Sequence, residues 1–354
     1  MVYKPKSLAI EAGFRQLVEW LNVHGAEHPL RTPAVLDCQT HGWIEFVQTA
    51  ACQSPAEVER FYRRQGAFLA LLHTLAATDF HFENIVAAGE HPVLIDLEAL
   101  FHHRLPGSAS DPSSRELIDS VMAVRMLPQV SRVEGLDEAI DFSGLGATPG
   151  RATPFQSATF AAAGTDEMQL THERYHLPAA RHLPTLRGAS IRLADYEHAL
   201  TEGFTATYHL LRRHGDELLA DNGPLATLAA AEVRFIARPT QSYAILLEQS
   251  MHPDRLRNEA ARSQLFDRLH ARAETLPCLH RLIPAERADL DVHNIPIFTT
   301  RPDSRDLWSS SGERIADFFD RSGLDMVRDR LLGYGDTDLA RQLAFIRRSF
   351  ASLV

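Results

Sequence analysis

Three polar residues around a short predicted hairpin constrain this chain more than any other feature. Asp79 and Asn84 are five residues apart, and Asp96 follows twelve residues after Asn84. The apolar residues 85–88 and 92–95 predict two short strands joined by a tight turn. Such a hairpin brings the residue before its first strand close to the residue after its second strand. We therefore expect Asn84 and Asp96 to lie at one edge of a cleft.

These residue types at these spacings are typical of a phosphoryl-transfer site. In that chemistry the first Asp orients or deprotonates the attacking hydroxyl, while the Asn and the second Asp hold Mg²⁺ against the phosphates of ATP. The alternative is a polar loop between a helix and a strand, in which the carboxylates cap neighbouring amides. The catalytic interpretation is favoured because three residue types, two spacings and the intervening hairpin agree.

The composition limits the classes of function. The 354 residues suffice for one large domain or two moderate ones, and the net charge of −10 argues against nucleic acid and anionic membranes as partners. The three cysteines are isolated and no Cys/His cluster is present, so we expect no zinc site, no disulfide framework and a reducing cytoplasm. No apolar run is long enough to span a bilayer.

The N-terminal residues predict part of a small lobe. Residues 2–5 read as the end of a strand, and Ser7 is placed to cap the helix that follows. Lys4 is the candidate for gripping a nucleotide phosphate, Lys6 is its near rival, and Glu11 is a candidate pairing acid. The alternative is a solvated terminal lysine.

The chain begins just before these lysines, and no glycine-rich loop precedes them. We therefore expect residues 1–52 to be a remnant of a small lobe with its hinge, and residues 53–354 to form a large catalytic lobe.

A second informative stretch is Glu232 to Thr240. Read as a strand, it places Arg234 and Arg238 on one face, and Pro239 ends it. Thr240 is then placed to cap the next helix. A helix N-terminus beside a guanidinium forms a phosphate site. The alternative is an arginine at a strand edge, paired with a surface carboxylate.

Apolar periodicity and turn residues predict the remaining elements. They are a hairpin over 34–36 and 43–47, a helix starting at Ser54-Pro55-Ala56-Glu57, a loop over 104–115, a helix over 116–127, a long loop over 141–166, a helix over 194–216, a loop over 293–304 and a helix over 338–353 whose Arg341, Arg347 and Arg348 form a solvated face.

With these residues in view, the chain resembles the dehydratase domain of class II lanthipeptide (lantibiotic type 2) synthetases. The matching segments run through nearly the whole chain in the family's order, and their joint occurrence is specific. They are Val2-Tyr3-Lys4-Pro5 and residues 78–84, 91–101, 233–243 and 295–308.

The resemblance implies an α+β, kinase-like fold related to lipid and protein kinases, with a truncated small lobe and a large, mainly helical C-terminal lobe. It implies a cytoplasmic enzyme that uses ATP and Mg²⁺ to phosphorylate Ser and Thr of a ribosomal precursor peptide, and then eliminates the phosphate in the presence of ADP.

The resemblance also assigns roles by motif position. Asp79 is the expected catalytic acid/base, with His81 beside it. Asn84 and Asp96 are the expected Mg²⁺ ligands with Glu98 close by, and Lys4 grips the nucleotide. The family ties the positions of Arg234 and Thr240 to the elimination step.

The departures from the family are as informative as the matches. From the comparison with the family, we expect this chain to lack the family's upstream small-lobe sequence and its zinc-bearing cyclase domain. We therefore expect no cyclase domain and no zinc, and a separate cyclase or a missing small-lobe polypeptide as a further partner.

Two other interpretations of the chain stay open. One is a non-catalytic or partner-dependent leader-peptide-binding fragment, motivated by the missing small-lobe sequence. The other is a small-molecule kinase of the aminoglycoside/choline kinase type, because the Asp-x-His-x-x-Asn pattern occurs there too. That pattern stands here at Asp79, His81 and Asn84.

Overall fold

The N-terminal part of the chain packs a small sheet onto a helix. The computed structural model describes residues 1–108, 111–132, 139–147, 150–162, 164–178, 181–252 and 254–353. The strands β1 (Val2–Lys4), β2 (Val35–Asp37) and β3 (Gly42–Ile44) form an antiparallel sheet in the order β1-β3-β2. The strand before Ser7 and the hairpin that follows are confirmed.

The helix α1 (Ala9–Val23) joins this sheet to the main core. Its apolar positions recur at helical spacing and are buried, and Phe14 stacks on Phe68 at 6.5 Å between ring centroids. The expected cap is confirmed in part. Leu8 is the residue that precedes the helix, and its amide donates to the Asp37 carboxylate at 2.8 Å, while the Ser7 hydroxyl accepts from the Ala9 amide at 3.2 Å.

Two long helices form the centre of the molecule. In α2 (Pro55–Thr74), Ser54 accepts a hydrogen bond from the Glu57 amide and Pro55 begins the helix, as expected. The helix α4 (Glu197–Arg213) lies along α2. Gly66 and Gly203 allow this approach, because a Cβ on either would lie 1.9 Å from a backbone oxygen of the facing helix.

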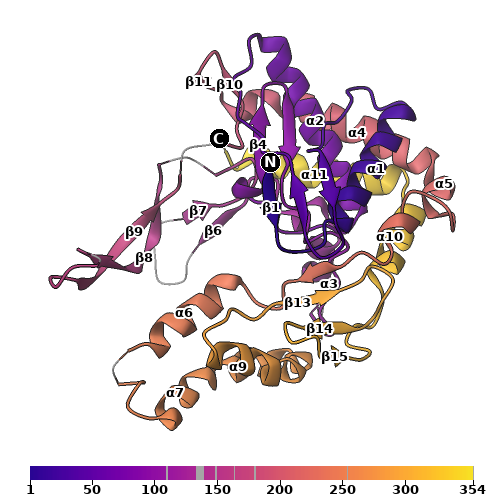
Figure 1. The fold of residues 1–354 in the computed structure, drawn as a ribbon. Coiled ribbons are helices and arrows are strands. Elements are labelled where there is room, and N and C mark those ends of the chain that lie inside the picture. Colours follow the sequence, from indigo (N-terminus) through magenta and orange to yellow (C-terminus); the bar gives the residue numbers. More distant parts are fainter. Residues whose placement is uncertain are drawn as a thin grey trace.

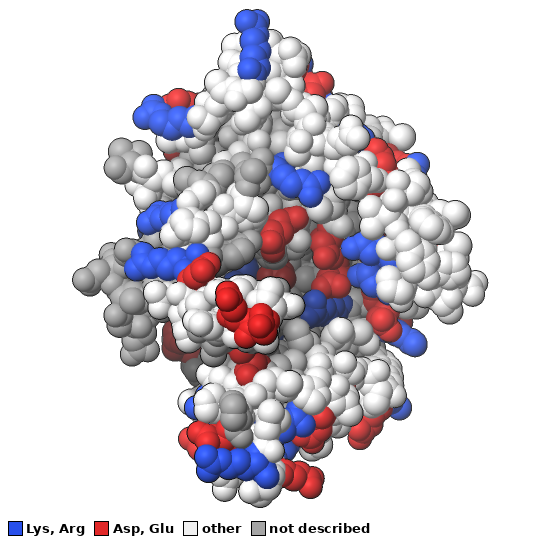
Figure 2. Space-filling view, turned by 60° about the vertical axis from the view of Figure 1, so that its left-hand side comes forward, with Lys and Arg blue, Asp and Glu red and all other residues white. Residues whose placement is uncertain are grey.

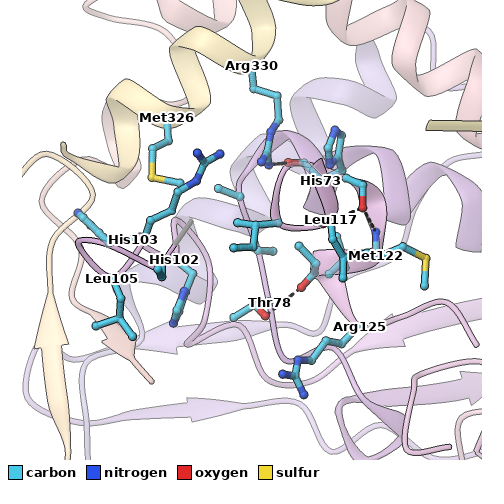
Figure 3. Close-up of a pocket in the computed structure, with 18 of the residues that line it drawn as sticks. His73, Thr78, His102, His103, Leu105, Leu117, Met122, Arg125, Met326 and Arg330 are labelled. Atoms are coloured by element: carbon cyan, nitrogen blue, oxygen red, sulfur yellow. Dashed lines mark hydrogen bonds between the residues drawn. The ribbon is translucent and has the colours of Figure 1, made fainter. Parts of the chain in front are cut away.

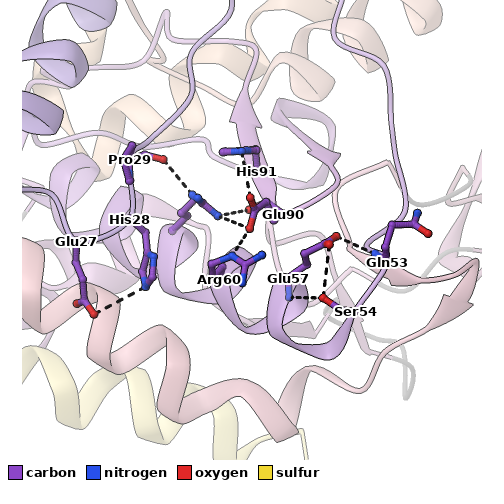
Figure 4. Close-up of polar contacts among 10 residues, drawn as sticks. Glu27, His28, Pro29, Gln53, Ser54, Glu57, Arg60, Glu90 and His91 are labelled. Carbon is purple, nitrogen blue, oxygen red and sulfur yellow. Dashed lines mark hydrogen bonds and ion pairs between the residues drawn. The ribbon is translucent and has the colours of Figure 1, made fainter.

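The hairpin after α2 is fastened to that helix by a network of charges. β4 (Ile85–Ala88) and β5 (His91–Leu94) pair antiparallel, as expected. At their turn, Glu90 forms ion pairs with Arg60 and Arg64 of α2 (Figure 4). Arg64 also donates to the carbonyl oxygens of Pro29 and Glu90 at 3.0 Å. These contacts therefore fix the position of the hairpin along α2.

The C-terminal half contains a second sheet with its own core. The strands β12 (Val233–Phe235), β13 (Phe298–Thr300), β14 (Leu307–Ser309) and β15 (Arg314–Ile315) pair antiparallel in sequence order. Four helices lie beside this sheet and share a hydrophobic cluster with it (Figure 1). They are α6 (Thr240–Ser250), α7 (Glu259–Phe266), α8 (Arg268–Thr275) and α9 (Ile283–Asp291).

A long two-stranded ribbon, β8 (Ala152–Ala161) with β9 (Gln169–His176), projects from the side of the body (Figure 1). The loop expected over 141–166 is therefore wrong over 152–161. Gly150 precedes the ribbon and Gly164 lies in the segment between its strands, whereas Pro154 lies within β8, where the pairing register shifts between Ala152 and Gln156. Residues 148–149 and 163 of that stretch lie outside the described residues.

The remaining described elements are short, apart from the C-terminal helices. They are the 3-10 helix η1 (Phe82–Asn84), α3 (Pro112–Ile118), η2 (Val121–Val124), β6 (Val130–Arg132), β7 (Ala139–Asp141), β10 (Thr185–Leu186), β11 (Ala189–Ser190), η3 (Leu193–Tyr196), α5 (Gly215–Leu219), η4 (Ala226–Leu228), η5 (Pro277–Arg281), α10 (Gly323–Leu332) and α11 (Asp336–Ala351).

Three sequence predictions are corrected by these bounds. The helix expected over 116–127 is two pieces, α3 and η2, with Ser120 between them capping the second. The helix α3 begins inside the loop expected over 104–115, whose residues 109–110 lie outside the described residues. The loop over 293–304 contains the strand β13. The helices over 194–216 and 338–353 are confirmed to within a few residues, and Arg341, Arg347 and Arg348 are exposed.

The fold is a mixture of helices and antiparallel sheets. Its relation to the kinases and the boundary after residue 52 stay predictions. One hydrophobic cluster contains buried residues of α1, α2, α4, α10 and α11, and so runs across that boundary.

Candidate functional site

The loop after α2 holds Asp79 in an uncommon backbone conformation. Its φ is +67°, in the left-handed region that Asp tolerates better than most residues. The Asp79 carbonyl oxygen accepts hydrogen bonds from the His81 amide at 2.9 Å and from Asn84 Nδ2 at 2.8 Å. Such strained positions cluster at functional sites because their surroundings over-determine them.

The hairpin brings Asn84 and Asp96 to the same end, as the sequence predicts. The amide of Ile95 donates to the Asn84 carbonyl oxygen at 3.1 Å, which places Asn84 one residue from Asp96 across the ladder. Burial raises the pKa of Asp96, and the neighbouring charge of Glu98 adds to the rise. Burial likewise raises the pKa of Asp79, where Asp96 acts in the same direction. The carboxylates of Asp79 and Asp96 thus repel each other, a repulsion that a bound cation would relieve.

Glu98 lies at the centre of the candidate site, between Lys6 and Arg234. One of its oxygens accepts from Lys6 Nζ at 3.2 Å, and the other accepts from a terminal nitrogen of Arg234 at 2.7 Å. Burial acts to raise the pKa of Glu98, but Lys6 and Arg234 outweigh it and hold that pKa below its usual value. The backbones of the same two residues are also hydrogen-bonded, because the Arg234 amide donates to the Glu98 carbonyl oxygen at 2.7 Å. Glu98 therefore joins the two sheets.

Lys6, and not Lys4, makes the ion pairs that the sequence assigned first to Lys4. Lys6 Nζ lies 3.8 Å from Glu11 Oε1 as well as 3.2 Å from Glu98. Burial acts to lower the pKa of Lys6, but Glu11 and Glu98 outweigh it and raise that pKa. Lys4, at the end of β1, contributes a weaker charge effect on Asp96 and Glu11. The reason is the position of Lys6 in the chain. It follows β1 and lies near Glu11 in the first turn of α1.

Arg234 and Thr240 come together, but not in the expected way. Arg234 donates to Thr240 Oγ1 at 3.1 Å. Thr240 is the first residue of α6, where Pro239 precedes the helix, so its hydroxyl does not cap the helix. The strand ends at Phe235, and Arg238 is therefore not on the face of Arg234. Arg238 instead forms a buried ion pair with Glu286 at 2.7 Å.

His81 lies beside Asp79, as expected, and its side chain turns back on its own loop. Its Nδ1 accepts a hydrogen bond from the Glu83 amide at 3.3 Å. Arg125 is the residue that the sequence did not indicate. It follows η2 in the left-handed conformation, with φ +65°, and its charge acts on the Asp79 carboxyl. The only sequence signal that could have indicated Arg125 is the end of a helical segment after Val124.

The face shown in Figure 2 carries charges of both signs, with carboxylates and cations side by side in a hollow near its middle. Among the described residues, no group of three or more His, Cys, Asp and Glu side chains is arranged as a metal site. Asn84 and Asp96 would supply two ligands, and Mg²⁺ is usually held by one or two carboxylates together with substrate phosphates. The donor set therefore fits a nucleotide-bound Mg²⁺ better than a protein-only metal cage. In the described part of the chain, no helix has the length and apolar character of a membrane span.

Comparison with known proteins relates the chain to a protein of lantibiotic biosynthesis. The chain is 26% identical over 340 residues to the lacticin 481/lactococcin biosynthesis protein LcnDR2 of Lactococcus lactis subsp. lactis. The match covers 89% of this chain and 35% of that protein, so the chain spans about a third of the length of this curated relative. A family model described as "Domain of unknown function (DUF4135)" matches residues 1–301. Because that match covers most of this chain, the chain belongs to the DUF4135 family.

Proposed function

We propose that this chain is a peptide-modifying enzyme that dehydrates Ser and Thr of a ribosomal lanthipeptide precursor, first by phosphorylating the hydroxyl and then by eliminating the phosphate. The observation that carries the proposal is the carboxylate of Glu98, which contacts Lys6 and Arg234 at 3.2 and 2.7 Å. It connects a cation suited to hold a nucleotide phosphate with a cation suited to hold a leaving phosphate. The relative's name, a lacticin 481/lactococcin biosynthesis protein, supports the peptide substrate.

Asp79 takes the role of acid/base in the first step. Its carboxylate accepts the proton of the Ser or Thr hydroxyl as the oxygen bonds to the γ-phosphorus of ATP, and the bond between that phosphorus and the β–γ bridging oxygen breaks. Asn84 and Asp96 would hold the Mg²⁺ ion, which supplies neutralisation of the phosphate charge when bound. Lys6, kept in place by Glu11 and Glu98, would hold the same phosphates. Dependence on ATP would place the reaction in the cytoplasm.

Arg234 and Thr240 take part in the second step. The Cα–H bond of the phosphorylated residue gives its proton to a base, its electron pair forms the Cα=Cβ bond, and the Cβ–O bond breaks to release phosphate. A guanidinium beside a hydroxyl holds a phosphate by charge and by hydrogen bonds. Arg234 and Thr240 form such a pair at 3.1 Å. The departing charge is then stabilised where it develops.

The decisive experiment incubates the chain with a Ser/Thr-containing lanthipeptide precursor, ATP, ADP and Mg²⁺, and follows the peptide by mass spectrometry. The wild-type chain is expected to remove one water mass per modified residue. Asp79→Asn should slow all modification on the order of a hundredfold, whereas Arg234→Ala should leave phosphorylated peptide. Arg347→Ala, on the exposed face of α11, is the matched control.

Other outcomes of this assay would contradict the proposal. Tight binding of the precursor without any change of mass would indicate a leader-peptide-binding module. Phosphorylation of a free aminoalcohol without action on the peptide would indicate a small-molecule kinase. Arg234→Ala that gives fully dehydrated peptide at the wild-type rate would remove Arg234 from the elimination step.

A further inference from the structure

A cavity of about 370 Å³ lies directly behind the catalytic loop. Residues 76–78 form one of its walls, η2 and Arg125 a second, and Met326 and Arg330 of α10 a third (Figure 3). None of the residues assigned above to phosphoryl transfer or elimination lines it. The cavity is therefore separate from the polar cluster, although Thr78 immediately precedes Asp79.

The cavity wall is strongly biased towards positive charge. Among its described lining residues are four arginines, and neither Asp nor Glu is among them. The arginines are Arg104, Arg125, Arg272 and Arg330. Two neighbouring imidazoles, His102 and His103, also line the wall, and burial lowers the pKa of each, so both are neutral near pH 7.

In a neighbouring cavity, aspartates neutralise most of the arginine charges. It has a volume of about 450 Å³ and shares Arg104 and Arg330 with the first. Its described lining carries four arginines but also four aspartates. Three of the arginines there are paired with an aspartate, in the pairs Arg104–Asp119, Arg321–Asp329 and Arg341–Asp338. The absence of such acids from the first cavity is therefore a local feature and does not reflect the composition of the chain.

Arg125, Arg272 and Arg330 carry the uncompensated charge of the first cavity. Arg104 is already paired with Asp119, whereas Arg330 donates to the neutral His73 carbonyl oxygen. Among the described residues, neither Arg125 nor Arg272 forms an ion pair with a carboxylate. Both side chains are exposed, so their guanidinium groups are accessible to an anion from solvent. Two like charges that line one cavity favour an anion bound between them.

We propose that this cavity binds a phosphate group, either free inorganic phosphate or the monoester of a phosphorylated side chain. The planar guanidinium group donates two parallel hydrogen bonds to phosphate oxygens, and two such groups match a dianion. A volume of about 370 Å³ exceeds what a chloride ion needs and leaves room for a phosphate with part of its ester. The binding is inferred from the cavity alone, whereas its effect on Asp79 rests on the proposed function.

Arg125 makes the cavity relevant to the catalytic loop. Its charge acts on the carboxyl of Asp79, and the Asp79 loop is hydrogen-bonded to the segment that carries it, from the Phe80 amide to the Val124 carbonyl oxygen at 3.1 Å. A phosphate bound to Arg125 would reduce the positive potential at Asp79. The cavity is thus a binding site from which a phosphate group would affect the reacting residues without contacting them.

The test is isothermal titration calorimetry of the whole chain with inorganic phosphate and with O-phospho-L-serine, in chloride buffer at constant ionic strength. The wild-type chain is expected to bind at least one of the two probes saturably. Arg125→Gln and Arg272→Gln should each weaken that binding on the order of tenfold, as expected for loss of one charge-assisted contact. Arg125 and Arg272 are both exposed, so both variants are expected to fold and each tests the site independently of the other.

Two controls make the result specific. Arg341→Gln removes a charge from the neutralised cavity only and should bind like the wild type. Arg234→Ala removes the phosphate contact of the proposed elimination site and should keep the binding. Preference for phosphoserine would identify a monoester, and comparable binding of inorganic phosphate would identify the free ion; both outcomes support the site.

Three outcomes would overturn the inference. They are the absence of saturable binding of both probes to the wild-type chain, unchanged affinity in both Arg125→Gln and Arg272→Gln, and binding that is lost only in Arg234→Ala.

Discussion

At the scale of single residues, Glu98 is the point where two cations depend on one carboxylate. Lys6 keeps a second partner in Glu11 at 3.8 Å, whereas the remaining side-chain partner of Arg234 is the neutral hydroxyl of Thr240 at 3.1 Å. Loss of the Glu98 charge therefore affects the two cations unequally. Arg234 loses its only carboxylate contact among the described residues.

This asymmetry gives a prediction for Glu98→Gln. We expect phosphorylated peptide to accumulate, because Lys6 stays oriented by Glu11 while Arg234 loses the charge that positions it. The elimination rate should fall on the order of tenfold to a hundredfold, more than the phosphorylation rate. The two rates are read from a mass-spectrometric time course. Glu19→Gln, on the exposed face of α1, is the control, and equal slowing of both steps would contradict the expected asymmetry.

At the scale of elements, the contact between α2 and α4 depends on two glycines. A Cβ at position 203 would lie 1.9 Å from the Arg63 carbonyl oxygen, and one at position 66 would lie 1.9 Å from the Leu200 carbonyl oxygen. Real Cβ atoms do not approach backbone oxygens so closely, so either substitution must push the helices apart. The central core between them would then be disturbed over its whole length.

We expect Gly203→Ala to lower the free energy of unfolding by about 1–3 kcal/mol or more through this overpacking. Gly215→Ala is the matched control, because a Cβ at that position of α5 meets no atom within 4 Å. Urea denaturation of the two variants measures the difference. A Gly203→Ala variant as stable as Gly215→Ala would show that the helices tolerate the separation.

At the scale of the whole molecule, buried histidines make stability depend on pH. Burial lowers the pKa of His102 and of His182 to about 4. In the unfolded chain a His has a pKa of about 6.5. Above that pH both states are neutral and the groups contribute nothing. As the pH falls from 6.5 towards 4, the unfolded chain binds protons that the folded chain does not, so stability is lost.

We therefore expect His182→Asn to lose less stability than the wild type between pH 7.5 and pH 5. His182 is 2% exposed and donates from Nε2 towards the Ala147 carbonyl oxygen at 3.2 Å. The urea midpoint at the two pH values gives the slope, even if the variant is less stable at both. His198→Asn, whose histidine side chain is 85% exposed, should keep the wild-type slope. Identical slopes in all three proteins would contradict this account.

The sequence by itself determined the parts of this protein that depend on local order. The hairpin over 85–94, the start of α2 at Ser54-Pro55 and the helix over 338–353 follow from turn residues, caps and apolar periodicity, which act over a few residues. The same locality explains why Asn84 and Asp96 were correctly expected at one end of the hairpin. The resemblance identified Arg234 and Thr240 by motif, without their geometry.

Only the tertiary structure decided which side chains meet across the fold. Glu98 contacts Lys6 over 92 residues of sequence and Arg234 over 136 residues, and no local pattern encodes such pairs. The strand expected over 232–238 ends at Phe235, and Arg238 forms a buried ion pair with Glu286, which lies 48 residues away in the sequence. The ion pairs of Lys6 and the position of Arg125 near Asp79 depend in the same way on packing between distant segments, whose energies appear only when those segments are brought together.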